Sequence, residues 1–179
     1  LSLNGISNSS SIKIAGDTFD EATIAFLRKR YGMLVGQNTA ETVKMTIGCV
    51  SERPEETSML VKGRDLKTGL PKEQMISSSE LMEAYKRPAR QIVDEVLAVL
   101  ESSAPELVAD IAQNGIVMTG GGSLLYGFDR LIEERTDIAC SIADDADSCV
   151  AYGCGKSLQW INSMQEGTIN IARRKLMKE

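Results

Sequence analysis

Three consecutive glycines, Gly120–Gly122, separate a short apolar run from a helical pattern, and this junction limits most strongly what the chain can fold into. The apolar run, residues 116–118, has the length and composition of a short buried strand. The sequence therefore predicts a strand, a glycine turn and a helix that follows at once. Five apolar residues should face inward from that helix: Leu124, Leu125, Phe128, Leu131 and Ile132.

The glycines allow two interpretations. Glycine adopts backbone dihedrals that are closed to other residues and lets a ligand lie directly on the main chain. The N–H groups that open the following helix point at the same place, which favours a nucleotide or another anion. The alternative is a tight turn that only folds the helix back on its strand, and the spacing alone favours neither.

Two common phosphate-binding motifs are not met. The dinucleotide motif G-x-G-x-x-G requires a glycine at Leu125. The segment GCGKS at 153–157 resembles the end of a P-loop, but the first glycine of that loop falls on Val150. We expect Gly153 and Gly155 to allow a neighbouring helix to pack closely instead.

Composition excludes several classes of protein. The net charge of −5 argues against general nucleic-acid binding. No apolar run reaches the roughly 18 residues that a membrane span needs. The four cysteines form no C-x-x-C pair and the chain has no histidine, so a zinc site is not expected. Free thiols in a reducing cytoplasm are the expected state of these cysteines.

The first half of the sequence holds two predicted β-elements. In residues 1–16, apolar and polar side chains alternate on both sides of a serine-rich turn, which is typical of a β-hairpin. The second arm of this hairpin holds Ile12 and Ile14. Residues 49–76 carry prolines and glycines between short mixed runs, which predicts a small β-element with exposed turns.

Four capping-box patterns mark predicted helix starts: Thr18-x-x-Glu21, Asn38-x-x-Glu41, Ser77-x-x-Glu80 and Ser103-x-x-Glu106. The first two helices should end at Gly32 and Gly48. Pro88 should kink the third helix or divide it in two. The fourth helix, with Pro105 in its first turn, should end at residues 114–115.

The end of the chain returns to alternating strands and helices. Residues 138–142 predict a strand and residues 148–160 a helix, and three aspartates lie between them: Asp144, Asp145 and Asp147. Aspartates at a helix start act as caps and favour the helix dipole, an interpretation we prefer to a metal cluster. The alternation predicts an α/β fold with parallel pairing, and the antiparallel hairpin at the front makes the sheet mixed.

Four motifs carry a resemblance to a known family: G-D-x-F-D, T-A-E-x-x-K, G-R-D-L-x-T-G-L-P-K and T-G-G-G. They lie within the stretches IKIAGDTFDEATIAFLRKRYGMLVGQNTAETVKMTIG, VKGRDLKTGLPKEQMIS and APELVADIAQNGIVMTGGGSLLYGFDRLIEE. In these segments the chain resembles the MreB/Mbl family of bacterial, actin-like, rod-shape-determining proteins. The similarity runs from Leu1 to about Ile161.

The resemblance implies the actin/heat-shock ATPase fold, which is ribonuclease H-like and holds ATP between two domains. This α/β chain would be the second domain only, a mixed sheet with helices and a small α+β insert. Residues 1–16 and 77–179 would form its larger subdomain, and residues 17–76 its smaller inserted subdomain. The first domain and the phosphate loops would lie upstream.

The resemblance also implies site residues. Glu41 and Lys44 would reach the ribose and adenine; the alternative is a solvated ion pair between two residues three apart on one helix face. Gly16 would let the chain pass close to the sugar and phosphates, although a plain turn before a helix explains it nearly as well. The nucleoside would face Gly120, Gly121, Gly122 and Ser123. No catalytic and no metal-binding residue is expected in this chain.

The function implied by the resemblance is that of a nucleotide-dependent cytoskeletal filament subunit. It would determine cell shape by organising lateral cell-wall synthesis under the inner membrane. The full-length protein would bind ATP, or GTP, with Mg2+ and hydrolyse it slowly, whereas this chain alone would be inactive. It would be cytoplasmic and membrane-associated, without nucleic acid and without direct membrane contact from this half.

The expected partners are further copies of the protein, a RodZ-like membrane partner that docks on residues 77–179, and the wall-synthesis machinery. The alternative function is the ATPase domain of a heat-shock chaperone or a sugar kinase of the same superfamily. A chaperone would carry a peptide-binding β-domain after the ATPase unit, and a sugar kinase would lack the G-R-D-L-x-T-G-L-P-K motif.

Overall fold

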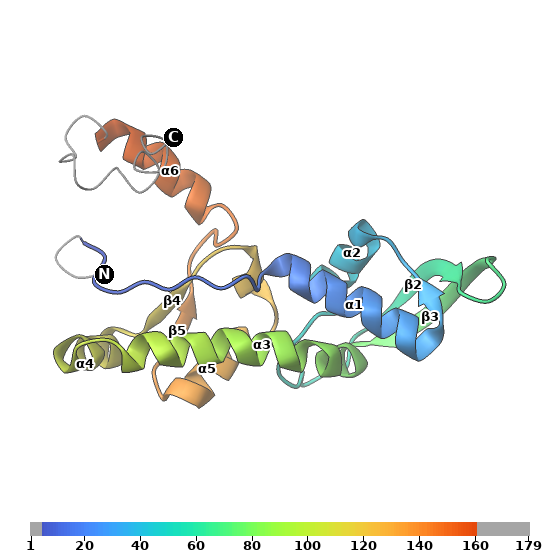
Figure 1. Ribbon diagram of the computed structural model, residues 1–179, viewed down its shortest axis with the longest axis horizontal. Coiled ribbons are helices and arrows are strands. Elements are labelled where there is room, and N and C mark those ends of the chain that lie inside the picture. Colours follow the sequence, from blue (N-terminus) through green and yellow to red (C-terminus); the bar gives the residue numbers. More distant parts are fainter. Residues whose placement is uncertain (1–4, 161–179) are drawn as a thin grey trace, which may run out of the picture.

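The computed structural model describes residues 5–160. Its helices are α1 (Gly16–Tyr31), α2 (Gln37–Ile47), α3 (Ser78–Glu101), α4 (Pro105–Asn114), the 3-10 helix η1 (Gly121–Leu124), α5 (Phe128–Thr136) and α6 (Cys149–Trp160). Its strands are β1 (Met33–Leu34), β2 (Ser58–Asp65), β3 (Pro71–Ser77), β4 (Ile116–Met118) and β5 (Cys140–Ile142). Helix α3 runs along the molecule, with the β1–β3 sheet at one end and α4 at the other (Figure 1).

Helix α3 begins where the sequence predicts. The Ser77 side chain accepts the Glu80 N–H at 3.4 Å, and the Glu80 carboxylate accepts the Ser77 N–H at 3.2 Å. Of the two outcomes predicted at Pro88, the division is wrong, because α3 continues through it, and the kink stays a prediction. A proline inside a helix costs about 3 kcal/mol. Full burial of Leu81 and Tyr85 on the same helix outweighs this cost, since each such side chain contributes about 1.5–3 kcal/mol.

Other helix boundaries are shifted by one to three residues. Helix α1 starts at Gly16 after an extended Ala15, and Thr18 lies inside it, where its hydroxyl accepts the Ala15 N–H at 3.4 Å. Gly32 ends α1 in the left-handed conformation, as predicted. The cap of α4 is Ala104 rather than Ser103, because the residue before a proline is held in an extended conformation.

The β-element predicted in residues 49–76 is confirmed as the hairpin of β2 and β3, and β1, which was not predicted, completes an antiparallel sheet in the order β1-β2-β3. Strands β2 and β3 pair from Ser58 opposite Ser77 to Arg64 opposite Pro71. The turn between them spans residues 66–70, so the two strands of this hairpin are close in sequence.

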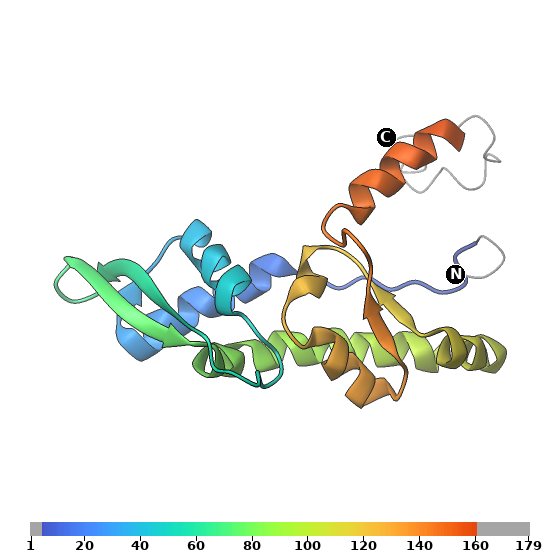
Figure 2. The same cartoon turned by 180° about the vertical axis from the view of Figure 1, so that it is seen from behind.

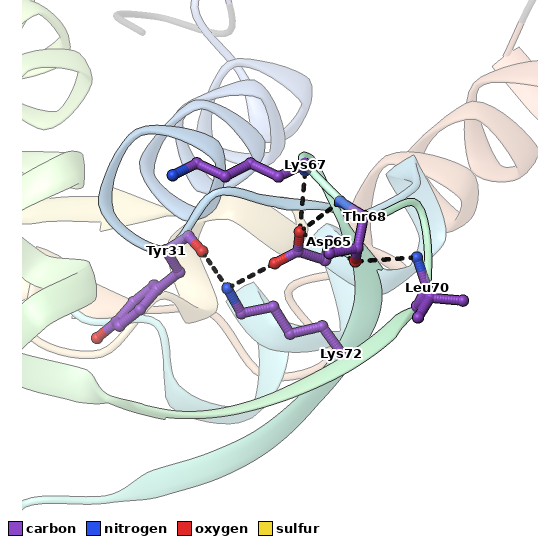
Figure 3. A network of polar contacts seen from close by, with 6 residues as sticks. All are labelled: Tyr31, Asp65, Lys67, Thr68, Leu70 and Lys72. Atoms are coloured by element: carbon purple, nitrogen blue, oxygen red, sulfur yellow. Dashed lines mark hydrogen bonds and ion pairs between the residues drawn. The ribbon is translucent and has the colours of Figure 1, made fainter.

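Asp65 organises the turn of this hairpin (Figure 3). Its carboxylate accepts the N–H groups of Lys67 and Thr68 at 2.9 and 3.0 Å and lies 3.1 Å from Lys72 Nζ. These contacts, the Thr68 N–H first, hold the pKa of Asp65 well below its usual range. Lys72 also donates to the Tyr31 carbonyl at 2.6 Å, which ties the turn to the end of α1.

Strands β4 and β5 pair in parallel from Ile116 opposite Cys140 to Met118 opposite Ile142, as the alternation of elements predicts. The predicted mixed sheet is not found among the described residues. One sheet is antiparallel throughout and the other is parallel.

The hairpin predicted in residues 1–16 was the expected source of a mixed sheet. The prediction of its second arm is wrong. Residues 6–15 form no strand, and residues 1–4 of its first arm lie outside the described range. Asn8 Nδ2 instead donates to Ser102 Oγ at 2.6 Å, which holds this extended segment against the end of α3. Ile12 and Ile14 are half-buried. The alternation of apolar and polar residues here arises because one face of an extended chain is covered, and not because the segment pairs as a strand.

The sequence predicted a helix immediately after the glycines, and this prediction is wrong. Helix η1 comes first, and α5 starts only at Phe128 because Gly127 adopts a left-handed conformation with φ +77°. A Cβ at Gly127 would lie 1.8 Å from Ser51 Oγ, so only glycine fits there. The interruption turns Leu124 outward with 57% of its surface exposed, while Leu125 stays buried.

Helix α6 projects away from the sheets (Figure 2). The Asp145 carbonyl accepts the N–H groups of Ser148 and Cys149, so the backbone rather than a carboxylate starts this helix. A Cβ at Gly153 or Gly155 would meet nothing within 4 Å. The close helix packing predicted for these glycines is therefore absent from the described residues.

The core is continuous across the two predicted subdomains. Phe19 of α1 makes edge-on contacts with Tyr85 of α3, at 5.1 Å between ring centroids, and with Phe128 of α5, at 6.5 Å. Such pairs add about 0.5–1.5 kcal/mol to area burial. The buried cluster also includes Leu27, Met33, Val43, Ile47, Val61, Ile76, Leu81, Val93, Leu125 and Ile132.

Candidate functional site

A cavity of about 430 Å³ opens between the helices α1 and α2 and the turn after β4. Pockets for small molecules commonly measure about 300–1,000 Å³. Two of the predicted site residues, Gly120 and Ser123, do not line it. The other five do: Gly16, Glu41, Lys44, Gly121 and Gly122.

Gly120 and Ser123 build the turn itself. Gly120 has φ +85°, a conformation that L side chains rarely adopt. Its N–H donates to the Ala146 carbonyl at 2.6 Å, and its own carbonyl accepts the Ser123 N–H at 3.0 Å and the Ser123 hydroxyl at 2.7 Å. Ser123 is buried, so its hydroxyl belongs to the turn rather than to the cavity.

Gly121 and Gly122 differ from Gly120. Neither has a positive φ, and a Cβ at either would meet nothing within 4 Å. The turn alone therefore does not require glycine at these two positions. A ligand that lies against the main chain does require it, because any side chain would occupy the same space.

Lys44 is held at the side of the cavity by an acidic residue that the sequence analysis missed. Its Nζ lies 2.8 Å from Asp20 Oδ1 and donates to the Gly16 carbonyl at 3.2 Å. The contact with Asp20 has the distance of an ion pair but not the geometry of a hydrogen bond. The alternative of an ion pair with Glu41 is absent from the ion pairs of the described residues.

Asp20 is buried on the inner face of α1 with Phe19, Thr23 and Leu27. A charged residue at the spacing of the apolar face is the sequence signal that could have identified it. A buried carboxylate is stable only when paired, so Asp20 fixes the position of the Lys44 ammonium.

The lining of the cavity suits the nucleoside part of a nucleotide. It contains three acidic residues, Asp17, Glu41 and Asp147, and two basic residues, Lys44 and Arg53. Its apolar residues are Phe19, Met45, Leu124 and Leu125. A base offers apolar faces and polar edges that match this mixture. Phosphates carry several negative charges and need more cations than this lining supplies.

A second residue that the sequence analysis missed is Arg53, in the loop between α2 and β2. Arg53 Nη2 donates to the Gly48 carbonyl at 3.1 Å, and its guanidinium carbon lies 4.4 Å from the centre of the Tyr126 ring. The sequence offers no signal for this pair, because Arg53 and Tyr126 lie in separate loops that only the fold brings together.

Cys49 lies next to this loop but is not suited to nucleophilic chemistry. Its side chain is buried and its Sγ donates to the Ser78 carbonyl at 3.3 Å. Burial raises the pKa of the Cys49 thiol, although the neighbouring Arg53 acts in the opposite direction. A neutral thiol is a poor nucleophile.

Within residues 5–160, no group of three or more His, Cys, Asp or Glu side chains is placed to hold a metal ion. None of the helices described in that range combines the length and apolar character of a membrane span.

Sequence comparison identifies relatives over most of the chain. The family described as MreB/Mbl protein matches residues 1–166. The cell shape-determining protein MreB of Escherichia coli (strain K12) is 44% identical over 162 residues, which cover 90% of this chain and 47% of the relative. The chain thus spans about half the length of the curated relatives it matches.

Solved structures also match most of this chain. MreB 5 of Spiroplasma citri bound to AMPPNP matches with a TM-score of 0.83 and 38% identity, over 89% of this chain and 48% of that one. The MamK double helical filament matches with a TM-score of 0.67 and 23% identity, over 83% and 46% of the two chains. At that identity the MamK likeness shows the fold alone, and the shared fold is the actin-like one.

Proposed function

The chain belongs to the MreB/Mbl family, and on that premise we propose that it forms the adenosine-side half of the ATP cleft in an actin-like, cell-shape-determining filament subunit. The observation that carries the proposal is the cavity of about 430 Å³, which brings Glu41 and Lys44 of α2 to Gly121 and Gly122. A relative in this family, MreB 5 of Spiroplasma citri, has been solved with AMPPNP bound.

The proposed site holds the nucleoside, and a preceding domain supplies the rest. Gly121 and Gly122 offer bare main chain to the ligand, while Glu41 and Lys44 provide one acceptor and one cation for its polar groups. The phosphates and Mg2+ would be held mainly by that other domain. The full-length protein would bind ATP, or GTP, and hydrolyse it slowly, and this chain alone would be inactive.

The proposed partners follow from the family. The protein would assemble with copies of itself, and a structure of the same fold, MamK, has been solved as a double helical filament. Residues 77–179 would contact a RodZ-like membrane partner, and the filament would organise lateral wall synthesis beneath the inner membrane. In this proposal the protein is cytoplasmic and reaches the membrane through its other half or through that partner.

The alternative of a heat-shock chaperone or sugar-kinase ATPase domain has no observation in its favour. The MreB/Mbl match covers residues 1–166, which include every predicted site residue.

Sedimentation of the full-length protein tests the proposed function. Purified protein is centrifuged with Mg-ATP, with Mg-GTP and without nucleotide over a range of salt concentrations. We expect a sedimentable polymer that depends on nucleotide, with filaments in the pellet by electron microscopy. Protein that stays in the supernatant under all of these conditions would contradict the proposal.

A further inference from the structure

Arg53 lines the cavity of about 430 Å³ and also a second cavity of about 200 Å³. Its side chain is fixed on two sides. Nη2 donates to the Gly48 carbonyl at the end of α2, and the guanidinium lies over the Tyr126 ring. A cation at a helix C-terminus and a cation over an aromatic face are both favourable, so this arginine is held before any ligand arrives.

Arg53 keeps donors free in this position. Arginine carries five N–H donors. Among the described residues, Nη2 makes one hydrogen bond, and Nε is buried with no partner, so Nε lies out of a ligand's reach. Nη1 makes no hydrogen bond in this part of the chain and is not among its buried unpaired atoms, so the N–H groups of Nη1 remain for an acceptor on a ligand.

Tyr126 is itself anchored to the loop that carries Arg53. The Val50 N–H donates to the Tyr126 carbonyl at 3.0 Å, and Cys49 and Tyr126 form an isolated parallel β-bridge. A second cation, Arg130, lies 5.9 Å from the centre of the Tyr126 ring. The Tyr126 main chain is therefore tied to this loop, and the Tyr126 ring lies against the Arg53 guanidinium.

Two parts of the cavity lining differ in chemistry. Lys44 meets the Gly16 carbonyl, which makes a polar corner. Four residues further along the chain, Gly48 packs so closely on Leu125 that a Cβ on the glycine would lie 2.8 Å from Leu125 Cδ1. Arg53 adds its donors to this second, mainly apolar corner, since its Nη2 is bonded to the Gly48 carbonyl.

We infer that Arg53 contacts the base of the bound purine nucleotide and that Tyr126 is the positioning residue for its guanidinium. A purine has apolar faces for the Gly48–Leu125 corner and ring-nitrogen acceptors at its edge for the guanidinium. The inference rests on the proposed function, because it requires a nucleotide in this cavity. The competing explanation is purely structural: Arg53 caps α2 and packs on Tyr126 without touching a ligand.

A base-free ligand separates the two explanations. Displacement of a fluorescent nucleotide from the full-length protein gives the affinities of Mg-ATP and of ribose 5′-triphosphate. Arg53→Met should weaken ATP binding about 3- to 10-fold, the loss expected for one hydrogen bond, and leave ribose triphosphate within about twofold. Arg53→Lys keeps the charge but not the planar fork, so it should lose a similar factor for ATP.

Two further variants complete the test. Tyr126→Leu should weaken ATP binding in the same selective way and add little in the Arg53→Met background, because the two residues act as one unit. Arg64→Met, at an exposed arginine of β2 outside the cavity, is the matched control and should change neither affinity.

The outcomes also distinguish the two proposals. Equal losses for ATP and ribose triphosphate in both Arg53 variants, or no loss for either ligand, would overturn the role of Arg53 while nucleotide binding stands. Wild-type protein that binds neither ligand would instead overturn the proposed function itself.

Discussion

At the scale of single residues, adjacent glycines in the T-G-G-G motif have different tasks. Gly120 is required by its backbone conformation, whereas Gly121 is required only if something lies against it. Gly121→Val should therefore leave the fold intact and lower nucleotide affinity about 5- to 150-fold, since overpacking costs about 1–3 kcal/mol. Titration calorimetry of the full-length protein measures the affinity, and thermal unfolding checks the fold.

Gly120→Val is the matched control for Gly121→Val. A β-branched residue at φ +85° should lower the stability of the fold by about 1–3 kcal/mol. If Gly121→Val binds nucleotide as tightly as the wild type does, the triple glycine is only a turn.

The Lys44–Asp20 pair makes a second prediction at this scale. The Asp20 side chain is 3% exposed and that of Lys44 is 16% exposed, so the two deletions should not cost the same. Lys44→Met leaves a buried carboxylate unpaired and should cost up to about 3–5 kcal/mol, whereas Asp20→Asn should cost less. Urea unfolding gives both values, and a larger loss for Asp20→Asn would contradict the assigned burial.

At the scale of secondary structure, the β2–β3 turn predicts a pH dependence. Asp65 has a lowered pKa in the folded state, so its contribution to stability is fully present above its unfolded pKa of about 4 and is lost progressively as the pH falls from there toward the lower folded-state pKa. Asp65→Asn should be less stable than wild type at pH 7, and the difference should shrink toward pH 3. Paired urea unfolding curves at several pH values measure this, and a difference that stays constant with pH would show that the carboxylate charge is not involved.

Sequence reasoning succeeded for elements that depend on neighbours in the chain. The Ser77–Glu80 capping box and the left-handed Gly32 are local signals, and both were predicted. The division at Pro88 and the second arm of the hairpin at 1–16 were wrong because packing partners decide them. A proline is tolerated when its helix is buried, and alternation becomes a strand only beside a free strand edge.

The candidate site shows the same limit. Glu41 and Lys44 came from a resemblance to known motifs, and the structure places both at one cavity. Asp20 was missed because a single charged residue on an apolar helix face was treated as an exception to the hydrophobic pattern and not as a functional residue. Arg53 and Tyr126 were missed because they lie more than 70 residues apart in the sequence and meet only in the folded chain.

At the scale of the whole molecule, one core and one cavity link the predicted insert to the rest of the chain. Phe19, Tyr85 and Phe128 join α1, α3 and α5, and the cavity takes its walls from both predicted subdomains. The relative position of α2 and the glycine turn is therefore fixed by the fold. This arrangement supports a preformed nucleoside site rather than one assembled by the ligand.

A crystal structure of the full-length protein with Mg2+ and AMPPNP tests the central claim most directly. The account predicts that the nucleoside lies against the main chain of Gly121 and Gly122, with Glu41 and Lys44 on its polar side and Arg53 at the base. A nucleotide bound elsewhere, with the space between α2 and the glycine turn left to solvent, would contradict it.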